Sequence, residues 1–554
     1  MEKIWLKSYP DGVPAEIDWR QFQSVGDLFE QSCAKFRDRA AYYNMGVTIS
    51  FGDLDRMSKA FGAWLQSKGL PKGTRIAIMM PNCLQFPICA FGALRAGYTV
   101  TNVNPLYTPR ELELQLKDSG AEVIVVLENF AHVLQQVRAR TAVKHVVVTS
   151  LGEMLGFKGH IVNFVVRRIK KMVPAWSIAD ALSLKDVLAE GASMPLKAVP
   201  TTHEDVAFLQ YTGGTTGISK GATLLHRNIL ANLEQACAWL RPFLDESKPQ
   251  AIITALPLYH IFSLTANALL MMKLGGCNIL ITNPRDIPAF VKELIKNRFT
   301  MFTGVNTLFN ALLQHPDLAK VDFSPVKVSL GGGMAVQKAV ADKWKQVTGS
   351  TLVEAYGLSE TSPAVTINPL DLKDYNGAIG LPLSSTEVSI RDDAGNELPL
   401  GGEGEICIRG PQVMAGYWNR PDETAKVMTA DGYFKSGDMG VMDDKGYVRL
   451  VDRKKDVLMV SGFNVYPNEI EGVVAMLPGV LECAVIGVKD EHSGEVPKLF
   501  VVKKDPALTE DMIRKHCHDN LTGYKRPKYI EFRTELPKTN VGKILRRALR
   551  EGGS

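Results

Sequence analysis

The sequence predicts an α/β protein. We expect a large N-terminal domain of parallel-type α/β subdomains with a small β-barrel-like subdomain, followed by a small α+β C-terminal domain. Three observations predict this. Short apolar runs alternate with helical patterns, after residue 380 short alternating strands replace them, and beyond residue 452 a compact mixed pattern begins. A chain of 554 residues is also too long for one core. The expected domains are residues 1–452 and 453–554.

The first 200 residues alternate between the two patterns. Helical periodicity covers residues 28–36 and 54–68, and an apolar crossover helix is expected at 84–96. Residues 75–80 and 123–127 are short apolar runs, typical of buried strands. Strands separated by such helices predict βαβ units in a mostly parallel sheet.

A second series of the same kind begins at residue 206 and ends near 357. Its expected strands are 206–209, 251–256, 300–304 and 351–354. After Gly380, alternating segments such as 388–391 and 405–408 are separated by Gly/Asp turns, which indicates an antiparallel sheet or barrel.

Composition narrows the functional classes. The chain is 45% hydrophobic and 22% charged, as is ordinary for a globular protein, and its net charge of +5 is too small to indicate a nucleic-acid partner. Eight scattered cysteines without a C-x-x-C pair predict reduced core residues of a cytosolic protein. Neither a signal peptide nor an apolar run long enough to span a membrane is expected.

One segment, residues 161–176, combines apolar side chains with four cations (Arg167, Arg168, Lys170 and Lys171) over about three helical turns, followed by Trp176. This pattern is typical of an amphipathic helix at an anionic lipid surface. A surface helix packed on its own domain would give the same pattern, so both interpretations stay open. The first predicts a cytoplasmic protein peripherally bound to the inner face of the cell membrane.

The strongest local signal is a loop rich in glycine and threonine after the strand at 206–209. Its residues are Tyr211, Thr212, Gly213, Gly214, Thr215, Thr216, Gly217, Ile218, Ser219, Lys220 and Gly221. Glycine allows close backbone approach to an anion, hydroxyls add donors and Lys220 adds charge, which favours a triphosphate. The spacing matches neither Walker A nor the Rossmann fingerprint. A polar hairpin is the plain alternative.

Four further motifs follow. Tyr356, Gly357, Ser359 and Glu360 place a ring, a hydroxyl and a carboxylate within five residues. Asp438 ends a Phe-Lys-Ser-Gly-Asp turn and suits two ribose hydroxyls. The sequence pattern changes at Asp452-Arg453-Lys454-Lys455-Asp456, which precedes a stretch around Gly462. Near the C-terminus, Lys543 follows a turn. Each motif alone is weak.

Their joint order resembles the adenylate-forming superfamily of acyl-CoA synthetases, peptide-synthetase adenylation domains and luciferases. Further likeness in residues 80–82, 103–108, 256–262 and 461–469 makes nearly the whole chain most similar to the bacterial long-chain fatty acid–CoA ligases. The resemblance implies two steps, in which a carboxylate and ATP give acyl-AMP and pyrophosphate, and CoA then displaces AMP. A medium-chain or other carboxylate–CoA ligase is the alternative within the superfamily.

The resemblance also implies the site. Thr212 to Lys220, beside Tyr211, would hold the β- and γ-phosphates, and Glu360 with Thr212 would hold Mg²⁺. Tyr356 would stack on adenine, with the backbone of Gly331, Gly332 and Gly333 on its other face. Ser359 would contact the α-phosphate, and Asp438 the ribose, assisted by Arg453. Lys543 would bridge the acyl carboxylate and the α-phosphate.

The resemblance extends to the second step and the acyl chain. The C-terminal domain would rotate about Asp452, presenting first Lys543 and then the Gly462 region, where CoA would bind. His260 would lie at the acyl pocket, and an apolar channel needs small or aliphatic residues, for which Ala268 and Gly304 are candidates together with residues 264–270 and 331–333. A homodimer is left open.

The chain departs from the family pattern at four positions. Gly213 stands where many relatives have serine, Ser219 replaces a common proline, and Ser359 and Ser436 stand where threonine is usual. The last two keep the hydroxyl and lose only a methyl group, so their roles can survive.

Rival functions also have to be weighed. A phosphotransferase or ATPase would want a Gly-rich loop and Mg²⁺ but would release ADP. A lipid-binding or scaffolding protein would not require Glu360, Asp438 and Lys543 together. Amino-acid adenylation is disfavoured, because no carrier domain follows and no acidic residue is placed for an α-amine. Luciferase chemistry shares the adenylation half and stays open.

Overall fold

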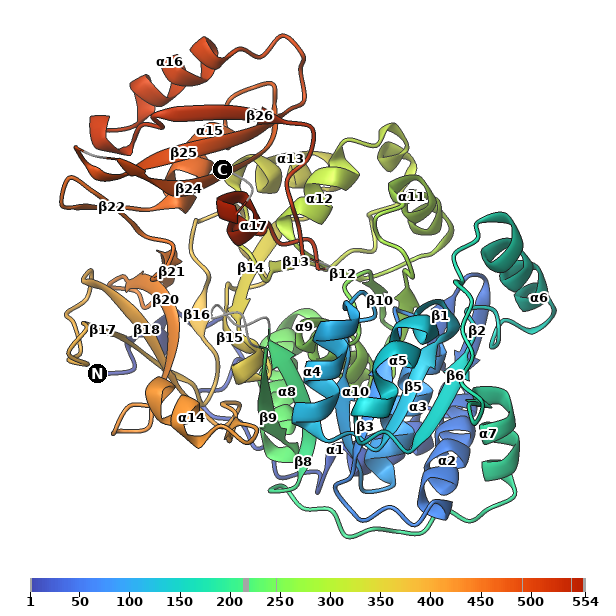
Figure 1. Ribbon diagram of the computed structural model, residues 1–554. Helices are drawn as coiled ribbons and strands as arrows, with labels where there is room; N and C mark the ends of the chain where they lie inside the picture. The colour runs from blue at the N-terminus through green and yellow to red at the C-terminus, as the bar shows by residue number, and fades with distance from the viewer. Residues whose placement is uncertain (1, 213–218, 246, 491, 540, 552–554) are drawn as a thin grey trace.

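The computed structural model describes residues 2–212, 219–245, 247–490, 492–539 and 541–551. Figure 1 shows a large body built from the N-terminal and middle parts of the chain, with the C-terminal part, in orange-red, packed against one side of it. The predicted fold class, a large N-terminal domain of parallel sheets followed by a smaller α+β domain, is confirmed.

The first sheet has eight strands in the described residues, in the order β19-β9-β8-β4-β3-β5-β6-β7. Its strands are β3 (Arg75–Met79), β4 (Thr99–Asn102), β5 (Val123–Leu127), β6 (His145–Thr149), β7 (Leu182–Ser183), β8 (Val206–Thr212), β9 (Lys220–Leu225) and β19 (Gly416–Tyr417). The strands from β7 to β8 pair in parallel, and β9 returns antiparallel to β8.

The helices of this part are α1 (Val25–Lys35), α2 (Phe51–Ser67), α3 (Gln85–Arg95), α4 (Pro109–Ser119), α5 (Ala131–Val137), α6 (Gly156–Phe164), α7 (Leu184–Ala192) and α8 (His226–Leu240). The first two, α1 and α2, illustrate how a capping residue sets the start of a helix. Ser50 caps α2 through a capping box with Asp53, so α2 begins three residues before the apolar periodicity does. Ser24 caps α1 by accepting a hydrogen bond from the Asp27 backbone N–H, and that helix also starts earlier than predicted.

The second sheet has nine strands within the described residues, in the order β16-β15-β14-β13-β12-β10-β11-β1-β2. They are β1 (Ala40–Asn44), β2 (Val47–Ser50), β10 (Ala251–Thr254), β11 (Cys277–Leu280), β12 (Met301–Gly304), β13 (Val328–Gly332), β14 (Leu352–Gly357), β15 (Ala364–Ile367) and β16 (Leu381–Pro382). Its helices are α9 (Ile261–Ser263), α10 (Leu270–Leu274), α11 (Ile287–Lys296), α12 (Asn306–Leu313) and α13 (Lys338–Thr348), with a π-helical turn at Leu264–Leu269 between α9 and α10.

The two sheets exchange strands. The early strand β1 pairs in parallel with β11 of the second sheet, whereas β8 and β9, at the start of the second series, complete the first sheet. The carboxyl ends of β8, β12, β13 and β14 all carry residues that line one cavity, which is where ligands bind in open α/β sheets.

A small antiparallel sheet follows, as predicted from the change of pattern after Gly380. It runs β17-β18-β20-β21, with β17 (Glu387–Arg391), β18 (Glu403–Arg409), β20 (Phe434–Met442), β21 (Val448–Arg453) and the helix α14 (Pro421–Val427). Arg453, predicted to open the C-terminal domain, is still paired with Asp438 in β21.

The C-terminal part has its own core around Val485 and Leu499. Its elements are β22 (Leu458–Val460), β23 (Phe463–Val465), α15 (Pro467–Ala475), β24 (Val480–Asp490), β25 (Gly494–Lys503), α16 (Glu510–Asn520), β26 (Tyr529–Arg533) and α17 (Arg546–Glu551). This small core shows that the C-terminal part is a separate packing unit.

The cysteines and the segment 161–176 can now be placed in the fold. All eight cysteines lie in the described residues and none is in a disulfide, and all but Cys277 are buried, as predicted. In the described parts of the chain, no helix is long and apolar enough to cross a membrane. The segment 161–176 is not one continuous helix, because the helical path through α6 ends in a π-helical turn at Ile169 and the chain then leaves it.

Candidate active site

A cavity of about 1850 Å³ lies between the large body and the C-terminal domain. Side chains from both sheets, from the small sheet and from the C-terminal segment line it. The sequence-predicted residues on its wall are Tyr211, Thr212, Lys220, His260, Gly332, Gly333, Tyr356, Gly357, Ser359, Glu360, Asp438, Arg453 and Lys543. Residues far apart in the sequence therefore meet at one site.

The predicted phosphate loop joins β8 to β9, whose ends pair at Thr212 and Lys220. Its central residues Gly213, Gly214, Thr215, Thr216 and Gly217 lie outside the described residues. At the loop's two ends, Ser219 Oγ donates a hydrogen bond of 2.6 Å to the Thr212 carbonyl, and the Lys220 ammonium pairs with Glu423. Lys220 Nζ also lies 5.1 Å from the centre of the Tyr417 ring.

The Tyr211 hydroxyl is engaged by a carboxylate of a neighbouring helix. Its hydroxyl donates a hydrogen bond of 2.8 Å to Asp118, which also pairs with Arg420. Burial and the Asp118 carboxylate raise the pKa of Tyr211 well above its ordinary value, so this hydroxyl stays protonated. The side chain thus anchors the start of the loop to α4.

Tyr356 and Asp438 form the predicted nucleoside end. The Tyr356 hydroxyl donates a hydrogen bond of 2.7 Å to Asp438 Oδ2, and Arg453 Nε lies 3.4 Å from Asp438 Oδ1. Arg453 reaches Asp438 because the two residues are paired across β20 and β21. Burial raises the pKa of Asp438, an effect that the Arg453 charge opposes. Gly332 and Gly333 line the cavity next to this group, whereas Gly331 does not.

Glu360 is a buried carboxylate on the cavity wall. Its Oε1 accepts a hydrogen bond of 2.8 Å from the Tyr417 hydroxyl. Burial raises the pKa of this carboxyl, and the Tyr417 hydrogen bond opposes that rise. Among the described residues there is no group of three or more His, Cys, Asp or Glu side chains that could hold a metal on its own.

This donor set suits one metal in particular. Mg²⁺ is usually bound by one or two carboxylates together with substrate phosphates and water, not by a full protein cage. One buried carboxylate, Glu360, and the hydroxyl of Thr212 on the same cavity wall fit that mode.

Lys543 enters the cavity from the C-terminal domain. A side-chain carbon added at Gly333 would lie 3.3 Å from Lys543 Cε, so the lysine stem passes directly over that glycine. The preceding carbonyl, of Gly542, accepts a hydrogen bond of 2.8 Å from Thr307 of α12. Burial, and next the charge of Arg453, lower the pKa of Lys543 to about 8.

Apolar side chains also line the cavity. They are Trp239, Leu240, Phe262, Ala266, Leu270, Met301, Val328 and Leu330. His260 lines it too, and burial together with the Lys543 charge lowers its pKa to about 3, so it is neutral. Ala268 and Gly304, the predicted channel residues, are buried but do not line the cavity, whereas Thr265 and Ala266 of the π-helical turn do.

Gly462 lies away from this site. It forms the turn between β22 and β23 with φ +85°, and no heavy atom beyond its chain neighbours would lie within 4 Å of a side-chain carbon there. The structure thus brings Lys543, and not Gly462, to the other predicted residues.

Sequence reasoning missed three residues of the site. Tyr417 and Glu423 contact Glu360 and Lys220, and their stretch of sequence carries no spacing signal. Glu354 lines the cavity, and burial raises its pKa to about 8. Its position two residues before Tyr356 was the only signal for it.

Comparisons with known proteins show the family of this chain. A family model described as AMP-binding enzyme matches residues 29–418, and one described as AMP-binding enzyme C-terminal domain matches residues 469–543. The chain belongs to the AMP-binding enzyme family. The predicted resemblance to the adenylate-forming superfamily is therefore confirmed.

Relatives extend over the whole chain. It is 56% identical to the long-chain-fatty-acid–CoA ligase of Yersinia pestis, covering 100% of this chain and 98% of the relative. The corresponding ligase of Haemophilus influenzae is 52% identical with the same coverage. The crystal structure of ATP-bound MatB from Rhodopseudomonas palustris aligns with a TM-score of 0.82 and 28% identity, covering 95% of this chain and 98% of MatB.

Proposed function

We propose that this protein is a long-chain fatty acid–CoA ligase that forms acyl-AMP and pyrophosphate from a fatty acid and ATP, then acyl-CoA and AMP. One observation carries the proposal: the polar side chains of Lys543, Asp438 and Glu360 and a set of large apolar side chains line one and the same cavity. The full-length identity of 56% to the Yersinia pestis long-chain-fatty-acid–CoA ligase supports it and confirms the sequence-based prediction of an AMP-forming ligase.

In the first step a carboxylate oxygen attacks the α-phosphorus, and the bond to the pyrophosphate oxygen breaks. Lys543 would contact both the carboxylate and the α-phosphate and offset the charge that develops there. Tyr356 and Asp438 would position the nucleoside, with Arg453 holding Asp438, and Ser359 would contact the α-phosphate. Thr212 and Lys220 would position the other phosphates. No protein nucleophile is needed, so catalysis is mainly positioning and charge stabilisation.

Mg²⁺ fits the described donors. Glu360 and Thr212 would hold it, and the metal would neutralise phosphate charge during displacement. Tyr417 would keep the Glu360 carboxylate turned toward the cavity through its 2.8 Å hydrogen bond.

In the second step the CoA thiolate attacks the acyl carbonyl carbon, and AMP leaves. ATP and CoA must react in turn with the same carboxyl group of the fatty acid, and pyrophosphate and CoA are both bulky anions. We propose that the C-terminal domain, residues 453–554, rotates about Asp452 so that Lys543 withdraws and the Gly462 turn takes its place. The separate core of this domain and the distance of Gly462 from the cavity support such an exchange.

The test is product analysis across a fatty acid series from acetate to oleate, with ATP, Mg²⁺ and CoA. We expect AMP and pyrophosphate in equal amounts, most rapidly with long chains, and a Lys543→Ala control that forms both about 10²–10³-fold more slowly. ADP as product would indicate a phosphotransferase and reject the proposal. A preference for short or medium chains would keep the reaction but reassign the substrate.

We further propose peripheral membrane binding at the inner face of the cell membrane, through the surface formed by Phe157, Ile161, Phe164, Ile169 and Met172, here called the α6 patch. These side chains are strongly exposed, Phe157 to 85%. The helix α6 lies at the edge of the large body (Figure 1). Arg168, Lys170 and Lys171 are also exposed, whereas Arg167 pairs with Glu128 at 2.9 Å and is partly structural.

Vesicle binding tests this second proposal. Glutamate at Arg168, Lys170 and Lys171 should weaken binding to anionic vesicles by about 1 kcal/mol per charge removed, in a salt-sensitive way. The matched control is glutamate at the exposed residues Lys292, Lys327 and Lys343, which lie elsewhere. Equal loss in both triple variants would reduce the α6 patch to an ordinary packed surface. The homodimer stays a prediction.

A further inference from the structure

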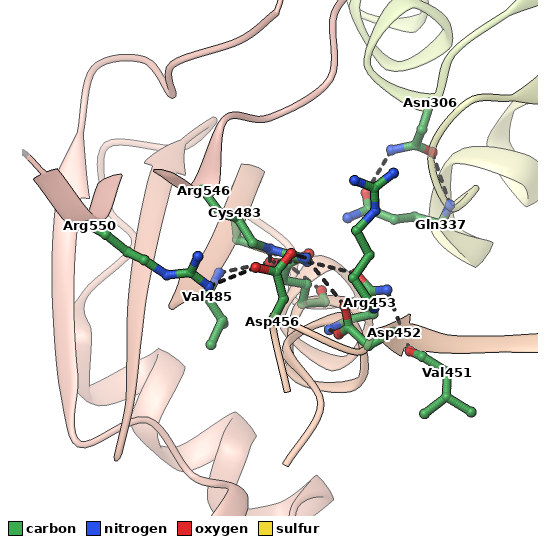
Figure 2. Close-up of polar contacts among 12 residues, drawn as sticks. Asn306, Gln337, Val451, Asp452, Arg453, Asp456, Cys483, Val485, Arg546 and Arg550 are labelled. Carbon is green, nitrogen blue, oxygen red and sulfur yellow. Dashed lines mark hydrogen bonds and ion pairs between the residues drawn. The ribbon is translucent and has the colours of Figure 1, made fainter. Parts of the chain in front are cut away.

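A compact group of charges surrounds Arg546, at the first residue of α17. The Arg546 guanidinium donates to both oxygens of Glu471 at 2.9 Å and to Asn468 Oδ1 at 2.7 Å. Its Nη1 lies 3.4 Å from Asp452 and 3.5 Å from Asp456. Figure 2 shows the carboxylates of Asp452 and Asp456 turned toward this guanidinium.

These partners come from both sides of the domain boundary. Asp452 is in β21, which pairs with β20 of the large body, whereas Asn468 and Glu471 lie on α15 of the C-terminal domain. The Asp452 carboxylate is completely buried, and its Oδ2 accepts a hydrogen bond of 2.8 Å from the Asn468 backbone. Arg546 therefore joins the end of the large body to the first helix of the C-terminal domain.

The group is also coupled to the cavity by the chain itself. Arg546 follows Lys543 by three residues, and the short connection between them is folded by hydrogen bonds from Lys543 N to Thr539 Oγ1 at 3.0 Å and from Leu545 N to the Pro537 carbonyl at 2.8 Å. A shift of the Arg546 backbone would therefore move Lys543. Displacement of a reacting group by about 1 Å can cost about 10²-fold in rate.

The charges make the group sensitive to loss of the arginine. Burial raises the pKa values of Asp452 and Glu471, and the Arg546 charge opposes that rise. Removing one partner of a buried ionic group leaves the others uncompensated. Without Arg546, these carboxylates would no longer hold the Lys543 segment against α15.

We propose that Arg546 is a positioning residue for acyl-AMP formation: by binding Asp452 and Glu471 together, it fixes the C-terminal segment so that Lys543 lies in the cavity. This inference rests on the proposed function. Arg546 itself does not touch the reacting groups. It acts in the first half-reaction, because Lys543 is needed there and the second step uses another face of the domain.

Two assays on the full-length enzyme test it. One measures fatty acid-dependent exchange of labelled pyrophosphate into ATP, and the other measures thioester formation from supplied acyl-AMP and CoA. Arg546→Gln and Asp452→Asn should each lower exchange about 10- to 100-fold, mainly in kcat. Both should retain thioester formation. In the double variant, the exchange rate should fall no further than in the more impaired of the two single variants, because the effects of partners in one network are not additive.

Controls separate positioning from folding. Arg514→Gln removes the same charge from the same domain, but Arg514 forms its hydrogen bonds within that domain, to Glu510 and to the carbonyls of Pro527 and Lys528. It should match the parent in both assays. Arg546→Lys keeps the charge without the planar fork, so exchange should be intermediate. If Arg546→Gln does not fold, Arg546→Lys and Asp452→Asn decide the matter by the same comparison.

An equal fall in both half-reactions, or unchanged exchange in Arg546→Gln, would overturn the inference. So would an Arg514→Gln variant that behaves like Arg546→Gln. A parent enzyme without fatty acid-dependent exchange would instead reject the proposed function, and the inference with it.

Discussion

The Tyr356 hydroxyl donates a 2.7 Å hydrogen bond to Asp438 Oδ2 and so joins the end of β14 in the nine-stranded sheet to β20 in the small antiparallel sheet. Both residues line the cavity, and they are 82 positions apart in the chain. The proposed nucleoside end of the site is therefore assembled from two separate sheets, with one hydrogen bond orienting the carboxylate that we propose binds the ribose.

The first prediction concerns that hydrogen bond. Tyr356→Phe keeps the ring for stacking but leaves Asp438 without its donor, so the KM for ATP should rise about fivefold, corresponding to about 1 kcal/mol. Initial-rate pyrophosphate release at varied ATP measures it. Tyr43→Phe is the control, because its hydroxyl binds Glu293 outside the cavity. An unchanged KM would show that the hydrogen bond does not position the ribose carboxylate.

Lys543 and Gly462 should be separable by half-reaction. Lys543→Ala should lower acyl-AMP formation about 10²–10³-fold, as for loss of one charge-stabilising donor, and still convert supplied acyl-AMP and CoA. Gly462→Leu should do the reverse, since a side chain there would obstruct the pantetheine arm. Pyrophosphate exchange and thioester formation are measured separately. If Lys543→Ala slowed both equally, alternation of the domain would have to be abandoned.

The pH dependence of adenylation follows from Lys543. Burial and Arg453 lower the pKa of this lysine to about 8, so its ammonium is present below that pH and is lost as pH rises through it. The value of kcat/KM for ATP, which reports the free enzyme, should accordingly fall above about pH 8. Lys543→Arg stays charged over this range and should show no such fall, whatever its absolute rate. The same fall in both enzymes would assign the titration to another group.

Glu360 should control the response to Mg²⁺. Glu360→Ala should lose activity that excess Mg²⁺ only partly restores. Tyr417→Phe removes the hydrogen bond that orients this carboxylate and should raise the Mg²⁺ concentration for half-maximal rate about tenfold. Mg²⁺ titration of pyrophosphate release measures both. Tyr433→Phe is the control, since its hydroxyl binds Glu387 in the small sheet. Near-normal rates of Glu360→Ala at low Mg²⁺ would count against a metal role.

The acyl end can be mapped by two neighbouring alanines. Ala266 lines the cavity, so Ala266→Trp should shift the preference toward shorter fatty acids. Ala268 is 2% exposed and does not line it, so Ala268→Trp should destabilise the fold by overpacking, by about 1–3 kcal/mol, and leave the chain-length profile of the folded fraction unchanged. Rates across the fatty acid series and thermal unfolding distinguish them. A shift only in Ala268→Trp would place the channel behind the π-helical turn.

The sequence by itself determined the local elements and the chemistry. Alternating apolar runs and helical periodicity predicted β5 at the residues observed and α1 and α2 to within three residues, because burial imposes its period on the side chains. The motifs around Tyr356, Asp438 and Lys543 likewise follow one another in the order that is typical of the adenylate-forming superfamily.

Only the tertiary structure decided which of these residues meet. Whether β1 joins the first or second sheet depends on long-range pairing with β11, which no local pattern encodes. The π-helical turn decides that Ala266 and not Ala268 faces the acyl end, because one extra residue per turn rotates the side chains that follow. In the sequence, nothing distinguishes Arg546 from an ordinary surface cation. Only the fold places it among the carboxylates of Asp452, Asp456 and Glu471. The physical reason is that such contacts join residues about 75–94 positions apart, beyond the reach of any helical or strand period.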